Sequence, residues 1–358
     1  MVTEKSTHFH ENITNNPHKL IKGVLIMKKV ISLVLCLIMI AALFAGCAAS
    51  SAPETTAPAE ETKVFNVAIV QQLDHASLDE IRTAAAAQLQ AIAAEKGVTV
   101  NVSEYHGQND PTVLGQIGAQ VVGDKVDMII PIATLAAQTM VTAAEGTNIP
   151  IVYAAISDPE AAGLTGLPTV TGTSDALNTP FILDMMLAAQ PEIQTVGLLY
   201  SNSEVNSATP IAEAKAYLDA KGIAYLEKTG NTTDEIVTAA NSLVGRVDAV
   251  FTPTDNVVMA AEAAVAEVLN KAGIPHYAGA DSFVQTGAFA TCGVNYTELG
   301  AKTADMAMDI LLGGDVPEFQ KMDGGIITVN TDTAAAVNVD YSVFSTMANT
   351  VVEVKTGE

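Results

Sequence analysis

Tryptophan is missing from this chain, and aromatic residues make up only 5% of its 358 positions. Basic residues are scarce as well, because 17 Lys and Arg stand against 40 Asp and Glu, for a formal net charge of -23. The Lys and Arg residues form no stripe or cluster along the sequence. Binding to nucleic acid depends on cationic contacts to phosphate, so this composition argues strongly against a nucleic-acid-binding protein. Solubility is a sufficient explanation for the acidity itself.

The sequence also lacks the motifs of common catalytic and cofactor sites. It has no G-x-G-x-x-G after the first predicted strand, no G-x-x-x-x-G-K-[ST], no H-E-x-x-H, no C-x-x-C and no G-x-S-x-G. His75, His106 and His276 do not have the spacing of metal ligands. We therefore predict a protein that is not an enzyme and that uses no cofactor and no metal.

The N-terminal residues have the pattern of an export signal. Residues 1–26 are interpreted as an upstream extension from a misassigned start, because Met27 begins a complete signal peptide, residues 27–46. Its apolar run from Val30 to Phe44 has signal-peptide length and is short for a membrane span. The run leads into Ala45-Gly46-Cys47, which is similar to the lipoprotein signal of bacteria. A plain cleaved signal and an uncleaved anchor are the alternatives.

Lipidation of Cys47 would make it the mature N-terminus and anchor the protein to the outer face of the cell membrane. One acyl chain binds a membrane only marginally, so a multiply acylated cysteine, with palmitate-type chains, is favoured. Residues 47–62 are rich in Ala, Ser, Thr, Pro and Glu and are predicted to form a flexible tether. Cys36 leaves with the signal and Cys292 lies in a strand-like run, so no intrachain disulfide is expected.

One pattern occurs twice in the remaining chain. Residues 122–131 and 244–253 both begin with Val-Gly and continue through a basic residue and Val-Asp to an apolar run that ends at Pro, and the first copy has one extra residue, Asp124, before its Lys. A helical pattern and an Ile-Pro pair follow each copy, at Ile149-Pro150 and Ile274-Pro275. Two copies of one array predict two similar lobes, and the cleft between two lobes is a common place for a ligand.

Short apolar runs alternate with Ala-rich helical patterns from Val64 onward, which is typical of mostly parallel sheets covered by helices. The predicted fold class is α/β, with two Rossmann-like lobes joined by a multi-strand hinge. Strands are expected near 65–70, 98–103, 127–132, 151–155, 195–200, 223–227, 248–252 and 276–278. Lobe 1 is assigned residues 63–173 and 292–320, and lobe 2 residues 174–291 and 321–354. Thr169–Ser174 is expected to cross between lobes, Ala288–Val294 to return to lobe 1, and Ile326–Val329 to cross again.

Ligands of open parallel sheets bind beyond the carboxyl ends of the strands, so residues just after each strand are the binding candidates. The candidates are Gln71, His75, Thr134, Ser157 and Asp158 in lobe 1, and Asn202, Glu204, Asn206, Ser207, Asp255, Asn256 and Asp281 in lobe 2. Loops of any α/β protein are polar because they are solvated, so each of these side chains can equally be an ordinary loop residue.

The charges of these loops are unevenly distributed. None of them contains Lys or Arg, while the acids Glu204, Asp255 and Asp281 all belong to lobe 2. Backbone amides at helix N-termini and hydroxyls in lobe 1 would bind a carboxylate, and the acids would bind an ammonium group. The pattern therefore favours a zwitterion. The alternatives are that some acids cap helices, Asp255 above all, and that the ligand is a sugar or nucleoside.

Several loop segments together resemble one family. They are Gln71–Asp79, Val122–Lys125, Ile132–Gln138, Ala155–Leu164, Leu199–Ser207 and Pro253–Asn256. The chain is similar, from about Val64 to Pro317, to the solute-binding lipoproteins of ABC transporters of the tryptophan/tyrosine type, which have the periplasmic-binding-protein type I fold. It departs from their pattern at Leu135, where Pro is usual, and at Ser157, where Thr is usual.

The resemblance implies a monomeric, extracytoplasmic protein that captures a small solute, such as an aromatic amino acid, for a membrane permease and its ATPase. It implies Thr134 and Ser157 as contacts for the ligand carboxylate or backbone side, and Glu204, Asn206, Asp255 and Asp281 as polar anchors. Two other classes are alternatives. One is a sensing module that serves a membrane receptor and uses the same fold. The other is an exported α/β enzyme, against which the missing nucleophile motif argues.

Overall fold

The computed structural model describes residues 62–357. The elements of this part are β1 (Val64–Gln71), α2 (Ala76–Lys96), β2 (Thr99–His106), α3 (Pro111–Gly123), β3 (Met128–Ile132), α4 (Thr134–Ala143), β4 (Ile151–Tyr153), β5 (Val170–Ser174), α5 (Thr179–Ala189), β6 (Thr195–Tyr200), α6 (Val205–Lys221), β7 (Ala224–Thr229), α7 (Thr233–Leu243), β8 (Ala249–Thr252), α8 (Asn256–Lys271), β9 (His276–Ala278), α9 (Asp281–Thr286), β10 (Ala290–Val294), α10 (Tyr296–Leu311), β11 (Gln320–Lys321), β12 (Gly324–Asn330), α11 (Thr331–Val337), the 3-10 helix η1 (Ser342–Thr346) and β13 (Thr350–Val354). The strands expected from the sequence are present, whereas the predicted signal, the predicted lipidation site Cys47 and nearly all of the predicted tether lie outside the described residues.

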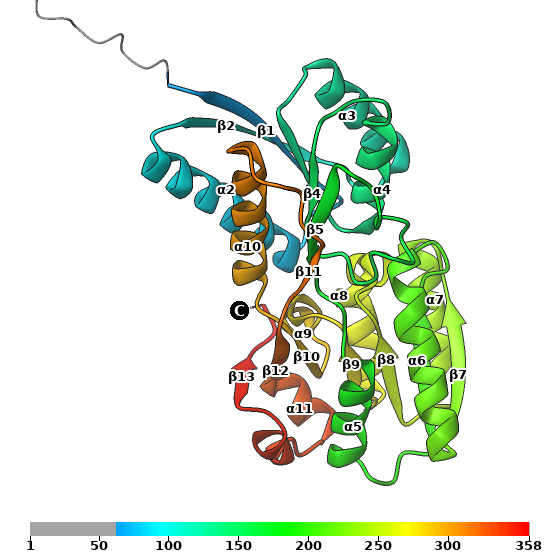
Figure 1. Cartoon of the computed structure of the whole chain (residues 1–358). Helices are drawn as coiled ribbons and strands as arrows, with labels where there is room; N and C mark the ends of the chain where they lie inside the picture. Colours follow the sequence, from blue (N-terminus) through cyan, green and yellow to red (C-terminus); the bar gives the residue numbers. More distant parts are fainter. Residues whose placement is uncertain (1–61, 358) are drawn as a thin grey trace, which may run out of the picture. The chain divides into compact units, whose positions relative to one another are not determined.

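These elements form two lobes, each built on one sheet (Figure 1). The strand order is β11-β5-β4-β3-β1-β2 in lobe 1 and β13-β12-β10-β9-β8-β6-β7 in lobe 2. Strands pair in parallel in both sheets, except that β10 and β12 are antiparallel. The α/β class with two parallel-sheet lobes is therefore confirmed.

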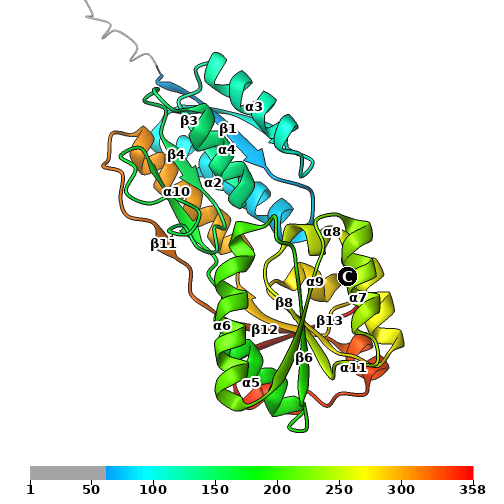
Figure 2. The same ribbon diagram turned by 90° about the vertical axis from the view of Figure 1, so that its right-hand side faces the viewer.

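Helices cover both faces of each sheet, which explains why central strands such as β3 are buried along their whole length. In lobe 1, α2 and α10 lie side by side on one face and α3 and α4 on the other (Figure 2). Gly300 permits the close approach of α10 to α2, because a Cβ there would lie 2.4 Å from the carbonyl oxygen of Ile81. In lobe 2, α7 and α8 pack together, as do α5 and α6.

The apolar core is continuous between the lobes on one side. The same buried cluster contains Ile81 and Leu299 from the α2 and α10 side of lobe 1, and Leu243 and Val265 from α7 and α8 of lobe 2. Phe283 of α9 belongs to it as well. The lobes therefore contact each other through buried hydrophobic side chains in addition to polar groups.

The placement of one strand differs from the expectation. Residues 290–294 form β10, which pairs with β9 and β12 in the sheet of lobe 2, so the predicted return of this strand to lobe 1 is wrong. The chain crosses only afterwards, and α10 packs on α2. Residues 170–174, expected to cross, form β5 of the first sheet. A strand pattern in the sequence does not reveal which neighbouring strand offers the better hydrogen-bonding edge. For β10 these neighbours are β9 and β12.

The structure contains three passages between lobes, after β5, between β10 and α10, and between β11 and β12. Within residues 62–357 no helix combines the length and the apolar character needed to cross a membrane.

Candidate ligand-binding site

A small cavity of about 30 Å³ lies where the two lobes meet. Lobe 1 contributes His75, Ser77, Leu78, Ala133, Thr134, Ala155 and Ser157, lobe 2 contributes Asn206, Thr254, Asn256, Ala280 and Phe283, and Asp175 and Tyr296 come from two of the passages between lobes. Five of the predicted binding residues thus line it: His75, Thr134, Ser157, Asn206 and Asn256. One buried water occupies about 10–15 Å³ of such space, so the cavity has room for a few waters at most. An organic solute therefore requires the lobes to lie further apart than they do here, both for entry and in the bound state.

Direct hydrogen bonds hold the lobes together around this cavity. Ser157 Oγ and Thr254 Oγ1 are 2.9 Å apart, and Ser77 Oγ donates to Asp281 Oδ1 at 2.9 Å. At the rim, Thr209 Oγ1 donates to Asp158 Oδ2 at 2.6 Å. The described arrangement is therefore a closed one, and opening exchanges these contacts for water.

Lobe 1 presents the N-terminus of α4 to the cavity. Thr134 is the first helical residue, and Ala133 before it has φ 74° and ψ 164°, an extended conformation with positive φ that is costly for a residue with a Cβ. Ala155, at the end of β4, has φ 56° and lines the cavity too. Two such residues at adjacent strand ends form a strained, preorganised wall. Free backbone N–H groups at a helix N-terminus attract anions, so this wall suits a carboxylate.

Asp175 is the acid that faces the cavity, and the sequence predictions missed it. Its side chain is buried, and it accepts hydrogen bonds from Ser157 Oγ at 3.0 Å and from the Tyr296 hydroxyl at 3.4 Å. No Lys or Arg lines the cavity. Burial raises the pKa of Asp175, and the two hydroxyl donors only partly oppose this effect. A carboxylate in such surroundings is best stabilised by a cation.

Two cavity-lining groups have polar atoms without partners. His75 Nδ1 and Asn206 Oδ1 are buried and make no hydrogen bond within the described part of the chain. Burial lowers the pKa of His75 to about 4, so its imidazole is neutral at physiological pH. The amide of Asn206 is held by its Nδ2 donation to the Thr254 carbonyl at 2.7 Å. Unsatisfied buried atoms cost about 1–3 kcal/mol each, so a polar ligand atom here would be stabilised.

Thr254 owes its position to a glycine. A Cβ on Gly279, directly after β9, would lie 2.4 Å from the Thr254 backbone nitrogen, so only glycine permits the β9 and β8 loops to approach this closely. The Thr254 hydroxyl then reaches Ser157 of the other lobe.

Glu204 lies behind the cavity wall and bridges the lobes. Its Oε1 accepts from Gln72 Nε2 at 3.3 Å, and its Oε2 accepts from Asn256 Nδ2 at 2.8 Å. Gln72 also accepts from the Leu135 amide in the first turn of α4 at 2.9 Å. Burial, together with the nearby charge of Asp255, raises the pKa of Glu204 to about 7. Glu204 therefore positions cavity residues and does not line the cavity itself.

Asp255 does not reach the cavity either. Its carboxylate caps α8 by accepting from the Val258 amide at 2.9 Å, and it accepts from the Ser201 amide and the Ser207 hydroxyl, both at 2.7 Å. These three donors all belong to lobe 2 and engage both carboxylate oxygens. The structure thus favours the capping alternative for Asp255, and it gives Ser207 the role of supporting that cap.

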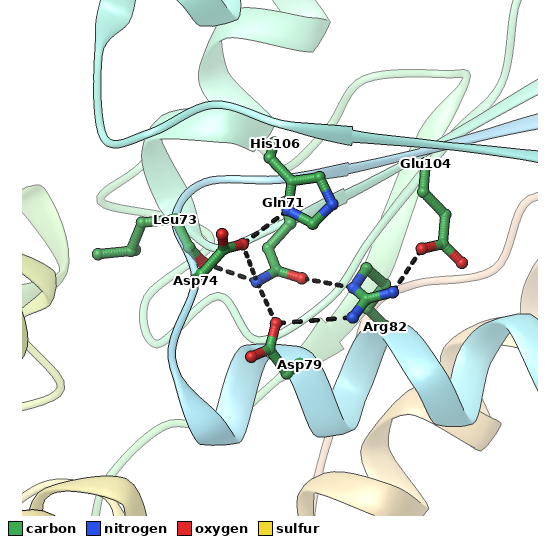
Figure 3. A network of polar contacts seen from close by, with 7 residues as sticks. All are labelled: Gln71, Leu73, Asp74, Asp79, Arg82, Glu104 and His106. Atoms are coloured by element: carbon green, nitrogen blue, oxygen red, sulfur yellow. Dashed lines mark hydrogen bonds and ion pairs between the residues drawn. The ribbon is translucent and has the colours of Figure 1, made fainter.

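Gln71 points into lobe 1 and is the centre of a polar network (Figure 3). Its Nε2 donates to the Leu73 carbonyl at 2.7 Å and to Asp79 Oδ1 at 2.8 Å, and its Oε1 accepts from Arg82 Nε at 3.0 Å. Arg82 also pairs with Glu104, and His106 pairs with Asp74 at 2.6 Å. Gln71 therefore fixes the turn between β1 and α2, which places His75, and makes no contact with the cavity.

The other candidates serve the walls of the cleft or lie outside it. Asp158 orders its own turn by accepting from the Ala161 amide at 2.9 Å, besides its contact with Thr209. Asn202 is exposed and donates to Thr229 within lobe 2. Asp281, the first residue of α9, lines a separate pocket next to the cavity. None of the three lines the cavity in this closed arrangement.

One sequence signal pointed to Asp175. It is the only charged residue between Glu160 and Asp184, and it directly follows a buried strand. Tyr296 was missed because it follows the strand that was assigned to the wrong lobe. Among residues 62–357, no group of three or more His, Cys, Asp or Glu side chains has an arrangement that could hold a metal ion.

Two parallel-sheet lobes that close over a polar cavity, with three chain passages between them, define the class of type I periplasmic binding proteins. The family model for ABC transporter substrate binding proteins matches residues 66–351, and the chain belongs to this family. It is therefore a substrate-binding protein of an ABC transporter.

Two relatives are close enough to be informative. The chain is 31% identical over 323 residues to a "Tyrosine-binding protein" of Clostridioides difficile (strain R20291), which covers 87% of this chain and 93% of the relative. It is 26% identical to an ABC domain crystallised in complex with L-Trp from Streptococcus pneumonia, with a TM-score of 0.75, covering 82% of this chain and all of that one.

A third relative is the ligand-free, open structure of a substrate binding protein with adhesive properties from Clostridium difficile. It is 31% identical, covers 82% of this chain and 99% of that one, and has a TM-score of only 0.62. The more identical protein is thus the less similar in shape. A rotation between lobes lowers a TM-score, so the difference agrees with the closed arrangement that the inter-lobe hydrogen bonds define.

Proposed function

We propose that the solute is an aromatic L-amino acid, bound as a zwitterion between the lobes and delivered to a membrane permease driven by an ATPase. Asp175 is the observation that carries this proposal, because it is a buried carboxylate in the cavity wall with neutral donors and no basic partner. The ammonium group of an amino acid supplies the missing charge. The names of the tyrosine-binding and L-Trp-bound relatives support the same solute class.

The rest of the cavity suits the other parts of such a ligand. The N-terminus of α4 and the hydroxyl of Thr134 would bind the carboxylate, as expected from the sequence. The hydroxyl of Ser157, also expected there, donates its proton to Asp175 instead and would hold this acid in place. Phe283 and Leu78 would pack against the aromatic ring, and His75 Nδ1 or Asn206 Oδ1 would accept a hydrogen bond from its polar edge. The aspartates Asp255 and Asp281, proposed from the sequence as ammonium partners, are replaced in this role by Asp175.

Ligand contacts to both lobes would favour the closed state, so the solute drives closure by its differential affinity. The closed form is the one we propose the permease recognises. The protein acts as a monomer without catalysis, outside the cytoplasm, anchored by lipid on Cys47. This location and anchor rest on the N-terminal sequence pattern.

Thermal unfolding with added amino acids tests the proposal. L-tyrosine, L-tryptophan or L-phenylalanine at 100 times its dissociation constant is expected to stabilise the protein by about 2.7 kcal/mol. N-acetyl-L-tyrosine, which lacks the ammonium group, should give little stabilisation. If aromatic amino acids have no effect while a sugar or a nucleoside stabilises the protein, the proposed solute class is wrong.

A further inference from the structure

A second pocket, with a volume of about 190 Å³, lies next to the solute cavity. Tyr296 separates the two, since it lines both. Glu80 of α2 contributes to the pocket from lobe 1, and Asp281 and Gln285 of α9 contribute from lobe 2. The floor consists of residues from β10, β12 and β13. The pocket thus spans the junction of the lobes but is distinct from the cavity that holds the proposed amino acid.

The charge of this pocket is uncompensated. Glu80 and Asp281 line it, and no Lys, Arg or His does. Asp281 accepts from Ser77, and Glu80 accepts from the Thr297 amide at 3.0 Å and from the Thr297 hydroxyl. All these donors are neutral. Burial raises the pKa of Asp281, and the negative charge of Glu80 raises it further. Two carboxylates that repel each other across a junction attract a cation into it.

An independent feature of the floor points to a ligand as well. Thr291 is fully buried, and its hydroxyl has no hydrogen-bond partner within the described chain. Side chains alternate between the faces of a strand, and Thr291 lines this pocket whereas its neighbour Cys292 lines a different one. Thr328, paired with Thr291 across the two strands, lines the same pocket. The unpartnered hydroxyl is therefore available to a ligand in the pocket.

The geometry points to a site for a small primary alkylamine, whose ammonium group contacts Glu80, Asp281 and the Thr291 hydroxyl. An ammonium group of this kind has three N–H donors and no acceptor, and the pocket offers two carboxylates and a hydroxyl. Val294, Ile326, Val352 and Val354 line the remaining wall and suit methylene groups. A bare metal ion fits less well, because no cluster of three metal-ligating side chains occurs in residues 62–357.

The amine would also influence the solute site. Because it contacts acids of both lobes, it would bind the closed arrangement more tightly than an open one, and the two ligands would then strengthen each other's binding by the same factor. This coupling rests on the proposed function. Binding of the amine in the absence of any amino acid does not.

Titration of the amino-acid-free protein with n-butylammonium chloride tests the site, with thermal unfolding and calorimetry as readouts and NaCl at equal concentration as the reference. Saturable stabilisation is expected. Glu80→Gln and Asp281→Asn should each weaken binding at least about tenfold, since each replaces a charged hydrogen-bond acceptor by a neutral one. Glu95→Gln, the same kind of change at an exposed position of α2, should leave binding unchanged.

Thr291→Val separates the ligand contact from the structural role of the residue. It removes an unsatisfied buried hydroxyl at nearly constant shape, so the free protein should melt at a higher temperature while butylammonium binds more weakly. Equal responses to butylammonium and to tetramethylammonium, which has no N–H group, would overturn the assignment. A response to CaCl2 alone, no saturable response, or unchanged binding by Asp281→Asn would overturn it as well. Tyrosine binding by the same sample reports on the proposed function separately.

Discussion

Asp175→Asn is expected to weaken binding of the amino acid by about 2 to 5 kcal/mol, roughly 30-fold to several thousand-fold. The change keeps the shape of the side chain and one oxygen acceptor for Ser157, but it removes the charge that faces the ligand's ammonium group. Without ligand, Asp175 has no cationic partner in the cavity wall. The free energy of unfolding of the variant should therefore equal or exceed that of the parent protein. Calorimetry with L-tyrosine and urea unfolding measure the two quantities.

Asp281→Asn is the matched control, because it changes another largely buried aspartate that lies beside the solute cavity without lining it. It should affect tyrosine affinity far less than Asp175→Asn does. Conversely, Asp281→Asn should impair binding of the alkylamine and Asp175→Asn should not. If Asp175→Asn binds tyrosine as tightly as the parent and Asp281→Asn does not, the ammonium partner is Asp281, as the distribution of charge in the sequence first indicated.

The lobes and five cavity residues could be predicted because parallel strands end at a common edge. Thr134, Ser157 and Asn256 lie two to four residues after the ends of β3, β4 and β8, and the sheet topology brings such positions together regardless of side-chain detail. Whether an acid at this edge faces the ligand or a helix is decided by local donors. Asp255 directly precedes α8, so the sequence offered helix capping as the alternative to ligand binding. The choice between the two depends on the nearby donors, here the Val258 amide of α8, the Ser201 amide and the Ser207 hydroxyl.

Asp175 shows the complementary difficulty. It belongs to a passage between lobes, and its place in the cavity depends on how the chain crosses there and on where α10 begins. The placement of Tyr296 follows from the pairing of β10 with β9 and β12, which is a competition between sheet edges. Predicting that a residue on a crossing segment lines the cavity therefore requires the three-dimensional topology, whereas predicting it for a residue at the end of a strand does not.

The protonation of Glu204 is expected to make the stability of the protein depend on pH. Burial and the charge of Asp255 raise the pKa of Glu204 from 4.5 to about 7 in the folded protein. A carboxyl whose pKa is higher in the folded state binds its proton more tightly there. Its contribution to stability is therefore complete below pH 4.5 and is lost as the pH rises through about 7. From these two values the loss amounts to about 3 kcal/mol at pH 8.

Glu204→Gln should remove this dependence, because the glutamine does not titrate. We expect the free energy of unfolding of the parent protein, measured in urea, to fall by about 3 kcal/mol more than that of the variant between pH 4.5 and pH 8. Other buried acids with raised pKa values, such as Asp175 and Glu262, remain in both proteins and cancel in this comparison. Asp255 does not cancel, because Glu204→Gln also removes the repulsion between the two carboxylates. This makes the stability of the variant depend still less on pH.

The side-chain oxygen of the variant can still accept one of the two hydrogen bonds that Gln72 and Asn256 donate. Loss of the second hydrogen bond would lower stability by the same amount at all pH values. Only the difference in slope reports on the charge. Parallel pH profiles of the two proteins would show that Glu204 is ionised at neutral pH with an ordinary pKa. In that case Gln72 and Asn256 would suffice to stabilise its charge, and the bridge between the lobes would be insensitive to pH.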